Sequence, residues 1–122
     1  KVELGGVTMI ARLTPGHTKG STTWAMKVQE AGKQLDVIFM PKYPGIVADY
    51  TYTFRLLKSL HCDVFLGPHG SFFSLLEKAA RLKQGEKNNP FIDPKGYRAF
   101  LEDSEKGFLE QLEKQRQASK TK

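Results

Sequence analysis

The spacing of apolar residues differs between two parts of this chain, and the difference indicates two kinds of secondary structure. Trp24, Met26 and Val28 occur at steps of two, which is the period of a strand with one buried face. Further along, Tyr50 and Phe54 belong to a series at steps of three and four, which is the period of a helix. We therefore expect a β-rich first third that is followed mainly by helices.

Three strands are expected in the first third, over residues 7–13, 22–28 and 35–40. Pro15 and Gly16 turn the end of the first strand into a loop, because proline and glycine interrupt regular backbone. The second and third strands flank a glycine and are predicted to form a hairpin. The third strand is a nearly continuous apolar run, which predicts burial on both of its faces.

The remaining chain alternates between helix and strand. The predicted elements are a helix ending near Leu60, a short strand over 63–67, a helix capped by Ser71 and ended by Gly85, and a long helix with Asp93 as its cap and Pro94 as its first residue. The order β, β, β, α, β, α, α predicts the α/β class, with a mixed sheet and helices packed on one of its faces.

Length and charge restrict the possible roles of the chain. Its 122 residues are enough for one compact domain, which we place at 1–114, with a frayed polar tail at 115–122. The net charge is +6, but it falls to +2 without four basic residues at the C-terminal end, namely Lys114, just before that tail, and Arg116, Lys120 and Lys122 within it. Because no basic stripe is interleaved with aromatic residues, we expect no nucleic-acid partner. No segment approaches the roughly 20 apolar residues of a membrane span, so no membrane association is expected.

Two of the three histidines occupy positions that are typical of functional side chains. His17 and His69 each follow the predicted end of a strand and are flanked by glycine or proline. Imidazole is the commonest metal ligand, yet a lone histidine often only forms hydrogen bonds, so the residues alone leave both roles open. His61 lies near the end of a predicted helix, where the helix dipole favours a histidine without any further role. The lone cysteine, Cys62, excludes a cysteine-rich zinc module and is expected to be buried.

Four segments carry a more specific signal. Residues 13–24 read LTPGHTKGSTTW and resemble the central histidine motif of the third subclass of class B β-lactamases. Three further segments resemble the same subclass in the same order, namely YPGIVADY at 43–50, CDVFLGPHG at 62–70 and NPFIDPKGYR at 89–98. The resemblance spans nearly the whole chain and identifies it with the C-terminal half of a metallo-β-lactamase.

This resemblance implies a fold, a cofactor and a reaction. The family has an αββα sandwich of two similar halves, with a pair of zinc ions at one edge of the facing sheets, so the chain is expected to form half of that sandwich. By motif, His17 resembles the third histidine of the first zinc site, and His69 resembles the histidine that completes the second. The implied reaction is attack of zinc-bound hydroxide on the carbonyl of a β-lactam substrate, in the periplasm or outside the cell.

The sequence departs from the family at two places. It contains no His-x-His-x-Asp-His segment, from which the family draws its other four zinc ligands. The serine-bearing loop that normally precedes Tyr43 is reduced to Met40-Pro41-Lys42. Because zinc sites need at least three protein ligands, we expect this chain alone to bind zinc weakly or not at all and to be inactive, and we assign no catalytic residue.

Half of a sandwich also lacks the sheet that would cover its apolar face. Exposed apolar surfaces of this kind drive association, so we expect either pairing with the missing N-terminal half or self-association. Two other functions remain open for the chain. One is a hydrolase of the same fold that acts on a lactone, ester or amide, and the other is a non-catalytic remnant that serves as an interaction domain.

Overall fold

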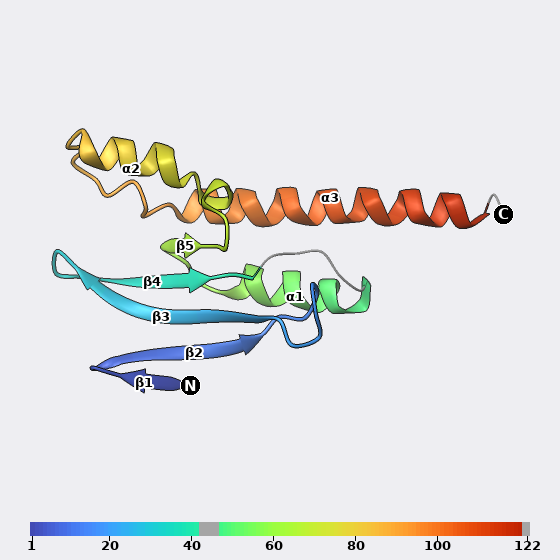
Figure 1. Cartoon of the computed structure of the whole chain (residues 1–122), viewed down its shortest axis with the longest axis horizontal. Helices are drawn as coiled ribbons and strands as arrows, with labels where there is room; N and C mark the ends of the chain where they lie inside the picture. The colour runs from blue at the N-terminus through green and yellow to red at the C-terminus, as the bar shows by residue number, and fades with distance from the viewer. Residues whose placement is uncertain (42–46, 121–122) are drawn as a thin grey trace.

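Five strands form one mixed sheet in the computed structural model, which describes residues 1–41 and 47–120 (Figure 1). They lie side by side in chain order; the first four pair antiparallel with one another, and the fifth pairs parallel with the fourth. The strands are β1 (Val2–Leu4), β2 (Val7–Leu13), β3 (Thr22–Glu30), β4 (Lys33–Phe39) and β5 (Val64–Leu66). The predicted mixed sheet is confirmed, and β1 is an additional strand at its edge.

Tight turns join two of the three antiparallel strand pairs. Ala31 and Gly32 connect β3 to β4 and have φ values of 48° and 77°. Gly5 and Gly6 connect β1 to β2 in the same way, with φ values of 57° and 79°. Two-residue hairpin turns with positive φ match the right-handed twist of the strands that they join. The predicted hairpin with its glycine turn is therefore confirmed.

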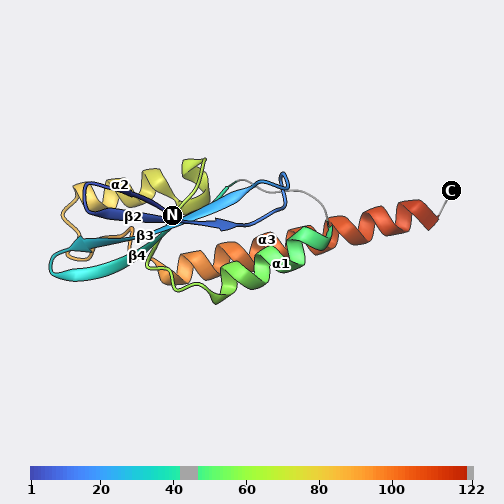
Figure 2. The same cartoon turned by 90° about the horizontal axis from the view of Figure 1, so that it is seen from below.

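Helices α1 and α3 lie on one side of the sheet (Figure 2). Their bounds are Val47–Ser59 and Pro94–Lys120. The core is packed between these helices and the sheet, where Ile38, Met40, Leu57 and Leu101 are each at most 2% exposed. Complete burial of side chains of this size contributes about 1.5–3 kcal/mol each, so this layer provides much of the folding free energy.

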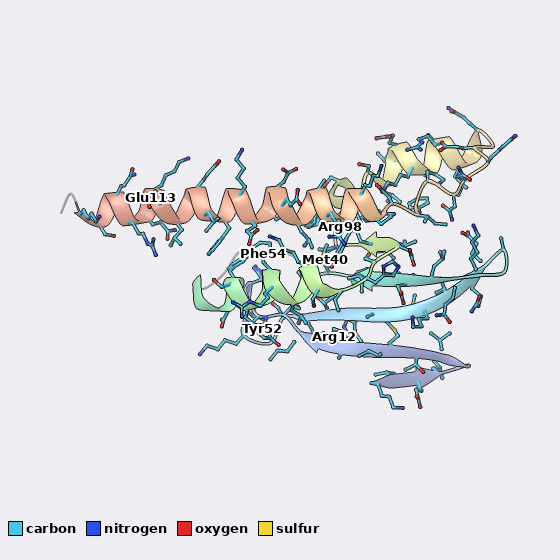
Figure 3. The ribbon with its side chains drawn as sticks, turned by 180° about the vertical axis from the view of Figure 1, so that it is seen from behind. Arg12, Met40, Tyr52, Phe54, Arg98 and Glu113 are labelled. Carbon is cyan, nitrogen blue, oxygen red and sulfur yellow. The ribbon has the colours of Figure 1, made fainter. Side chains whose placement is uncertain are left out.

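The two sides of α1 differ as the apolar period predicts. Figure 3 shows Phe54 on the side of α1 that faces α3 and Tyr52 on the other side. Phe54 is 2% exposed, whereas Tyr52 is 54% exposed. The predicted helix is confirmed over the whole of α1, and Ile46, at its expected start, lies outside the described residues.

The opposite side of the sheet is apolar along every strand, and we call it the apolar face. Strand pairing places the following residues on it: Val2, Leu4, Val7, Met9, Ala11, Leu13, Trp24, Met26, Val28, Leu35, Val37, Phe39, Val64 and Leu66. Val37 is buried in the middle of this face, but Phe39 at the end of β4 is 43% exposed. The prediction that residues 35–40 are buried on both faces is therefore wrong at Phe39, which points away from the core beneath α1 and α3.

A short 3₁₀ helix, η1 (Gly70–Phe73), and the helix α2 (Leu75–Lys83) lie beyond the β5 edge of the sheet (Figure 1). The prediction that Ser71 caps this helix is wrong, because Ser71 lies inside η1. Ser74 occupies the N-cap position of α2 in a left-handed conformation, with φ of 55°, and its side chain makes no capping bond. This single residue interrupts the helical backbone without disturbing the apolar pattern. Gly85 follows the end of α2 with a φ of 81°, as expected for a helix-ending glycine.

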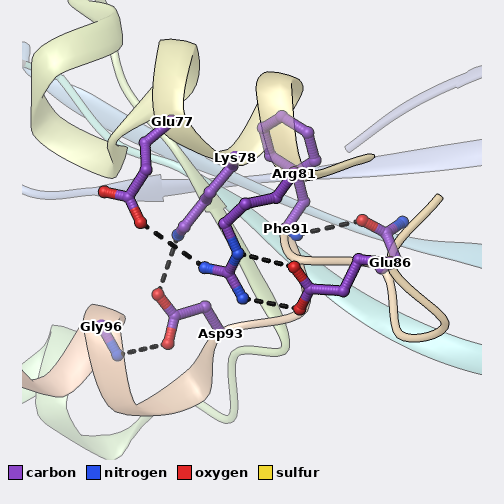
Figure 4. Close-up of polar contacts among 8 residues, drawn as sticks. Glu77, Lys78, Arg81, Glu86, Phe91, Asp93 and Gly96 are labelled. Atoms are coloured by element: carbon purple, nitrogen blue, oxygen red, sulfur yellow. Dashed lines mark hydrogen bonds and ion pairs between the residues drawn. The ribbon is translucent and has the colours of Figure 1, made fainter. Parts of the chain in front are cut away.

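The start of α3 is as predicted. The N–H of Gly96 donates to Oδ1 of Asp93 at 2.8 Å, which is the bond of a helix N-cap. The other oxygen of the same carboxylate, Oδ2, lies 2.8 Å from Nζ of Lys78 in α2 (Figure 4). Asp93 therefore caps α3 and also forms an ion pair with α2.

Helix α3 continues beyond the domain boundary expected at residue 114. Residues 115–120 are helical and exposed, and Figure 1 shows this end of α3 extending past α1. Fraying of the tail in solution stays a prediction. Among the described residues, neither α3 nor any other helix is long and apolar enough to cross a membrane.

Candidate metal centre

Both predicted metal ligands lie at one edge of the sheet, where strands end and loops leave it. His17 follows β2, and His69 follows β5. Strands β2, β4 and β5 run in the same direction, because β3 is antiparallel to β2 and β4, and β5 is parallel to β4. The loops after β2 and β5 therefore leave the sheet at the same edge. Strands β3 and β4 lie between them, so β2 and β5 are about 14 Å apart at the usual strand spacing.

The loop that carries His17 is closed by its own hydrogen bonds. The N–H of Thr14 donates to the carbonyl of Ser21 at 2.8 Å, and the N–H of Thr18 donates to Oγ of Ser21 at 3.0 Å. Thr14 and Ser21 are buried, whereas His17 is exposed. The hydroxyl residues of the motif therefore fix the base of the loop and leave the imidazole accessible.

Two further hydrogen bonds attach this loop to the body of the protein. The hydroxyls of Thr14 and Thr23 lie 2.9 Å apart, and both residues are fully buried. The hydroxyl of Thr53, also fully buried, donates to the carbonyl of Pro15 at 2.6 Å. Losing the partner of a buried polar group costs about 1–3 kcal/mol, so these contacts hold the loop firmly against β3 and α1.

The loop that carries His69 is shorter and turns directly into η1. The carbonyl of His69 accepts a hydrogen bond from the N–H of Phe72 at 3.0 Å, and the two rings pack edge to face at 5.2 Å. A Cβ atom at Gly70 would lie 3.0 Å from Cβ of Leu75, so the close approach of the two segments requires glycine. His69 itself is exposed at the start of this turn.

His17 and His69 are suitable zinc ligands, but two ligands are too few for a zinc site. Imidazole nitrogen is a preferred zinc ligand, but structural and catalytic zinc sites use three or four protein ligands. Within residues 1–41 and 47–120, neither His17 nor His69 belongs to a group of three possible ligands. The described residues therefore do not form a complete zinc site at this edge, and the role of both histidines stays a prediction.

A different group of three possible ligands lies at the opposite end of β5. Asp36, His61 and Asp63 each place a ligand atom within 4.8 Å of the other two. Asp63 directly precedes β5, whereas His69 follows it. The expectation that His61 only lies near the end of a helix is incomplete, because α1 ends at Ser59 and the imidazole of His61 contacts two carboxylates. Two signals were available, namely the close spacing of His61 and Asp63 and a carboxylate within the apolar strand β4.

The expected short loop after β4 begins within the core. The N–H of Met40 donates to the carbonyl of Leu66 at 2.9 Å, and the side chain of Met40 is 1% exposed. The pairing of β4 with β5 is thereby prolonged by one residue. Lys42 and Tyr43, at the other end of the loop, lie outside the described residues.

Comparison with known proteins relates this arrangement to solved enzymes. No protein-family profile matches the sequence. The FEZ-1 metallo-β-lactamase from Legionella gormanii is 40% identical with a TM-score of 0.86, and the match covers 94% of this chain and 49% of that one. BJP-1, a subclass B3 metallo-β-lactamase of Bradyrhizobium japonicum, is 36% identical with a TM-score of 0.86, over 96% of this chain and 49% of that one. A metallo-β-lactamase from Cronobacter sakazakii is 34% identical with a TM-score of 0.83, over 94% and 50% of the two chains.

The three matches have the same extent. Each covers nearly all of this chain, and the chain spans about half the length of each solved relative. The buried Cys62, the two histidine loops and the Asp93 cap all lie in segments on which the resemblance was based. The chain therefore corresponds in sequence and fold to half of a subclass B3 metallo-β-lactamase, in agreement with the predicted C-terminal half.

Proposed function

We propose that this chain supplies one half of a zinc-dependent β-lactam hydrolase. The observation that carries the proposal is the placement of His17 and His69 at one edge of the sheet, in a chain 40% identical to the FEZ-1 metallo-β-lactamase. Exposed imidazoles on short loops at a strand end are suited to metal binding. In this proposal the two histidines hold the metal, each at a different position of a two-zinc site.

The remaining ligands would come from the polypeptide that completes the sandwich. Two imidazoles fall short of a catalytic zinc site, which has three protein ligands and an open position. The apolar face offers a surface for that polypeptide, because side chains such as Leu13 and Phe39 are half exposed on it. The solved relatives are about twice as long as this chain, which leaves room for such a second half. The chain alone is therefore proposed to be inactive.

The chain's own residues would position the metal rather than move protons. Thr53 and Thr23 fix the loop beneath His17, and η1 fixes the backbone of His69. Zinc held by a complete ligand set lowers the pKa of a coordinated water, which is the chemistry needed to open a β-lactam ring. Action in the periplasm or outside the cell is part of the same proposal.

A fusion protein tests this function directly. The chain replaces the matching half of the FEZ-1 metallo-β-lactamase in a single polypeptide, and zinc content and hydrolysis of a chromogenic cephalosporin are measured. We expect the fusion to bind zinc and to hydrolyse the cephalosporin, and we expect both the zinc content and the hydrolysis to fall in the His17→Ala and His69→Ala variants. The matched control is His61→Ala, which removes a histidine at the opposite end of β5 and should leave hydrolysis intact.

Two other outcomes would favour the alternatives. A folded fusion that binds zinc but hydrolyses lactones or esters in place of β-lactams would assign the chain to another hydrolase of this fold. A folded fusion that binds no zinc at all would indicate a non-catalytic interaction domain. In either case the β-lactam hydrolase proposal would be abandoned.

A further inference from the structure

The side chains of Asp36, His61 and Asp63 meet on the same side of the sheet as α1. Nε2 of His61 lies 3.2 Å from Oδ1 of Asp63 and 3.9 Å from Oδ2 of Asp36. The three residues come from the middle of β4, the segment after α1 and the position just before β5, which pairs with β4. Separate segments thus bring one nitrogen and two oxygens together.

Each of the two carboxylates has one oxygen that is already held and one that faces His61. Oδ1 of Asp36 lies 2.7 Å from Nζ of Lys27, which leaves Oδ2 toward the imidazole. Oδ2 of Asp63 accepts the N–H of Asp36 at 2.8 Å, which leaves Oδ1 toward the imidazole. Hydrogen bonds to the outer atom of a ligand are the usual means of orienting a metal-binding side chain. The two oxygens are therefore oriented before any ion binds.

Two of the three separations match those around a small divalent ion. Ligand atoms lie about 2.0–2.2 Å from such an ion, so pairs of them are about 3–4 Å apart. The distances of 3.2 and 3.9 Å from Nε2 fall in this range, and all three atoms are within 4.8 Å of one another. One imidazole with two carboxylates suits a first-row transition metal better than calcium or magnesium, which prefer oxygen alone.

Space for further ligands exists beside the cluster. Asp36 and His61 border a cavity of about 550 Å³ that is also lined by Arg12, Lys27 and Gln34. The side chain of His61 is 70% exposed, so an ion can reach it from solvent. Waters in this cavity can complete the coordination that three protein atoms begin, as in metal sites that keep an open position.

We propose that Asp36, His61 and Asp63 bind a divalent transition-metal ion such as Zn²⁺, at a site separate from the edge that carries His17 and His69. In the absence of the ion, Nε2 of His61 and Oδ1 of Asp63 lie 3.2 Å apart, at hydrogen-bond distance. Binding would join the end of α1 to β4 and β5. The proposal does not depend on the β-lactam hydrolase function.

The test uses the full chain in which His17→Ala and His69→Ala are combined, so that His61 is the one histidine left of three. Zn²⁺ is titrated by calorimetry, with bound metal measured by mass spectrometry after dialysis. We expect about one ion per chain, and an affinity that falls at least about tenfold when His61→Ala is added. The matched control is Asp103→Asn, which removes an exposed carboxylate of α3 and should leave the affinity unchanged.

A second measurement does not require altering the cluster. In the same double variant, the ¹⁵N resonances of the single imidazole are recorded with and without Zn²⁺. Coordination should shift the Nε2 resonance while the backbone spectrum stays that of the folded chain. The proposal is overturned if Nε2 does not respond at saturating Zn²⁺, if no ion binds, or if His61→Ala binds the ion as tightly as its parent.

Discussion

Lys78 and Asp93 form an ion pair of 2.8 Å that links α2 to the first turn of α3, and the lysine side chain is only 7% exposed (Figure 4). Nζ of Lys78 also lies 5.6 Å from the centre of the Phe65 ring, which is a favourable position for a cation. A helix that turns a lysine toward the core needs a countercharge there. Asp93 provides it while it caps α3.

Asp93→Asn separates these two roles of the carboxylate. Asparagine remains a good helix cap, but it leaves the buried ammonium of Lys78 without its countercharge. We expect a loss of about 2 kcal/mol in the free energy of unfolding. This value lies between the contribution of an exposed ion pair and the cost of removing one partner of a buried pair. Urea unfolding measures the change, and Lys78→Met combined with Asp93→Asn should recover part of it. No recovery in the double variant would argue against coupling between the two residues.

The same pair predicts a loss of stability in acid. Burial by itself raises the pKa of Asp93, but the hydrogen bonds from Lys78 and Gly96 and the nearby positive charges bring the pKa below its usual value. A lowered folded pKa stabilises the protein above the unfolded pKa of about 4 and ceases to do so as the pH falls through the folded value. Unfolding measured from pH 6 down to pH 2 should therefore show a smaller loss for Asp93→Asn than for the natural chain. Parallel curves would contradict this assignment.

Thr53→Val tests whether the loop of His17 is held from α1. Valine preserves the shape of the side chain but removes the hydroxyl that donates to the carbonyl of Pro15. We expect a loss of about 1–3 kcal/mol in the free energy of unfolding and faster amide hydrogen exchange in the loop. Thr51→Val, at an exposed position of the same helix, is the matched control. Equal effects of the two substitutions would mean that the hydroxyl of Thr53 has no special part.

The sequence predicted those elements whose burial repeats locally. The hairpin of β3 and β4 and the buried side of α1 follow from apolar periods within single segments. Strand β1 was missed because a segment of three residues is too short to display a period. The break at Ser74 was missed because one left-handed residue leaves the spacing of apolar residues unchanged.

Some residues of the candidate sites could be predicted from the sequence, and others could not. His17 and His69 could be selected because each stands at the end of a strand beside glycine or proline. The pairing of Lys78 with Asp93 and of His61 with Asp36 could not be predicted in this way. Asp93 and Asp36 are distant in sequence from Lys78 and His61, and only the approach of the N-cap of α3 to α2 and the pairing of β4 with β5 bring them close.

The thiol of Cys62 should react slowly in the folded protein. Burial raises its pKa to about 12, and the negative charges of Asp63 and Asp36 act in the same direction. Since the thiolate is the reactive form, a disulfide reagent at pH 8 should modify the chain only after unfolding in guanidinium. The folded thiol also keeps its proton where an unfolded one, with a pKa near 8.5, loses it. Stability should therefore fall as the pH rises above about 8.5, and Cys62→Ala should remove that dependence.

Association through the apolar face can be tested with two positions of nearly equal exposure on opposite sides of the sheet. Phe39 is 43% exposed on the apolar face, and Ile10 is 44% exposed on the side of α1. Because an exposed apolar face favours association, Phe39→Lys should lower the average mass in sedimentation at high protein concentration, and Ile10→Lys should not. Both positions are already half in solvent, so neither lysine has to be buried and both variants should remain folded. If Ile10→Lys disperses the chain as fully as Phe39→Lys does, the contact involves the α1 side, and the apolar face is not the surface through which this chain associates.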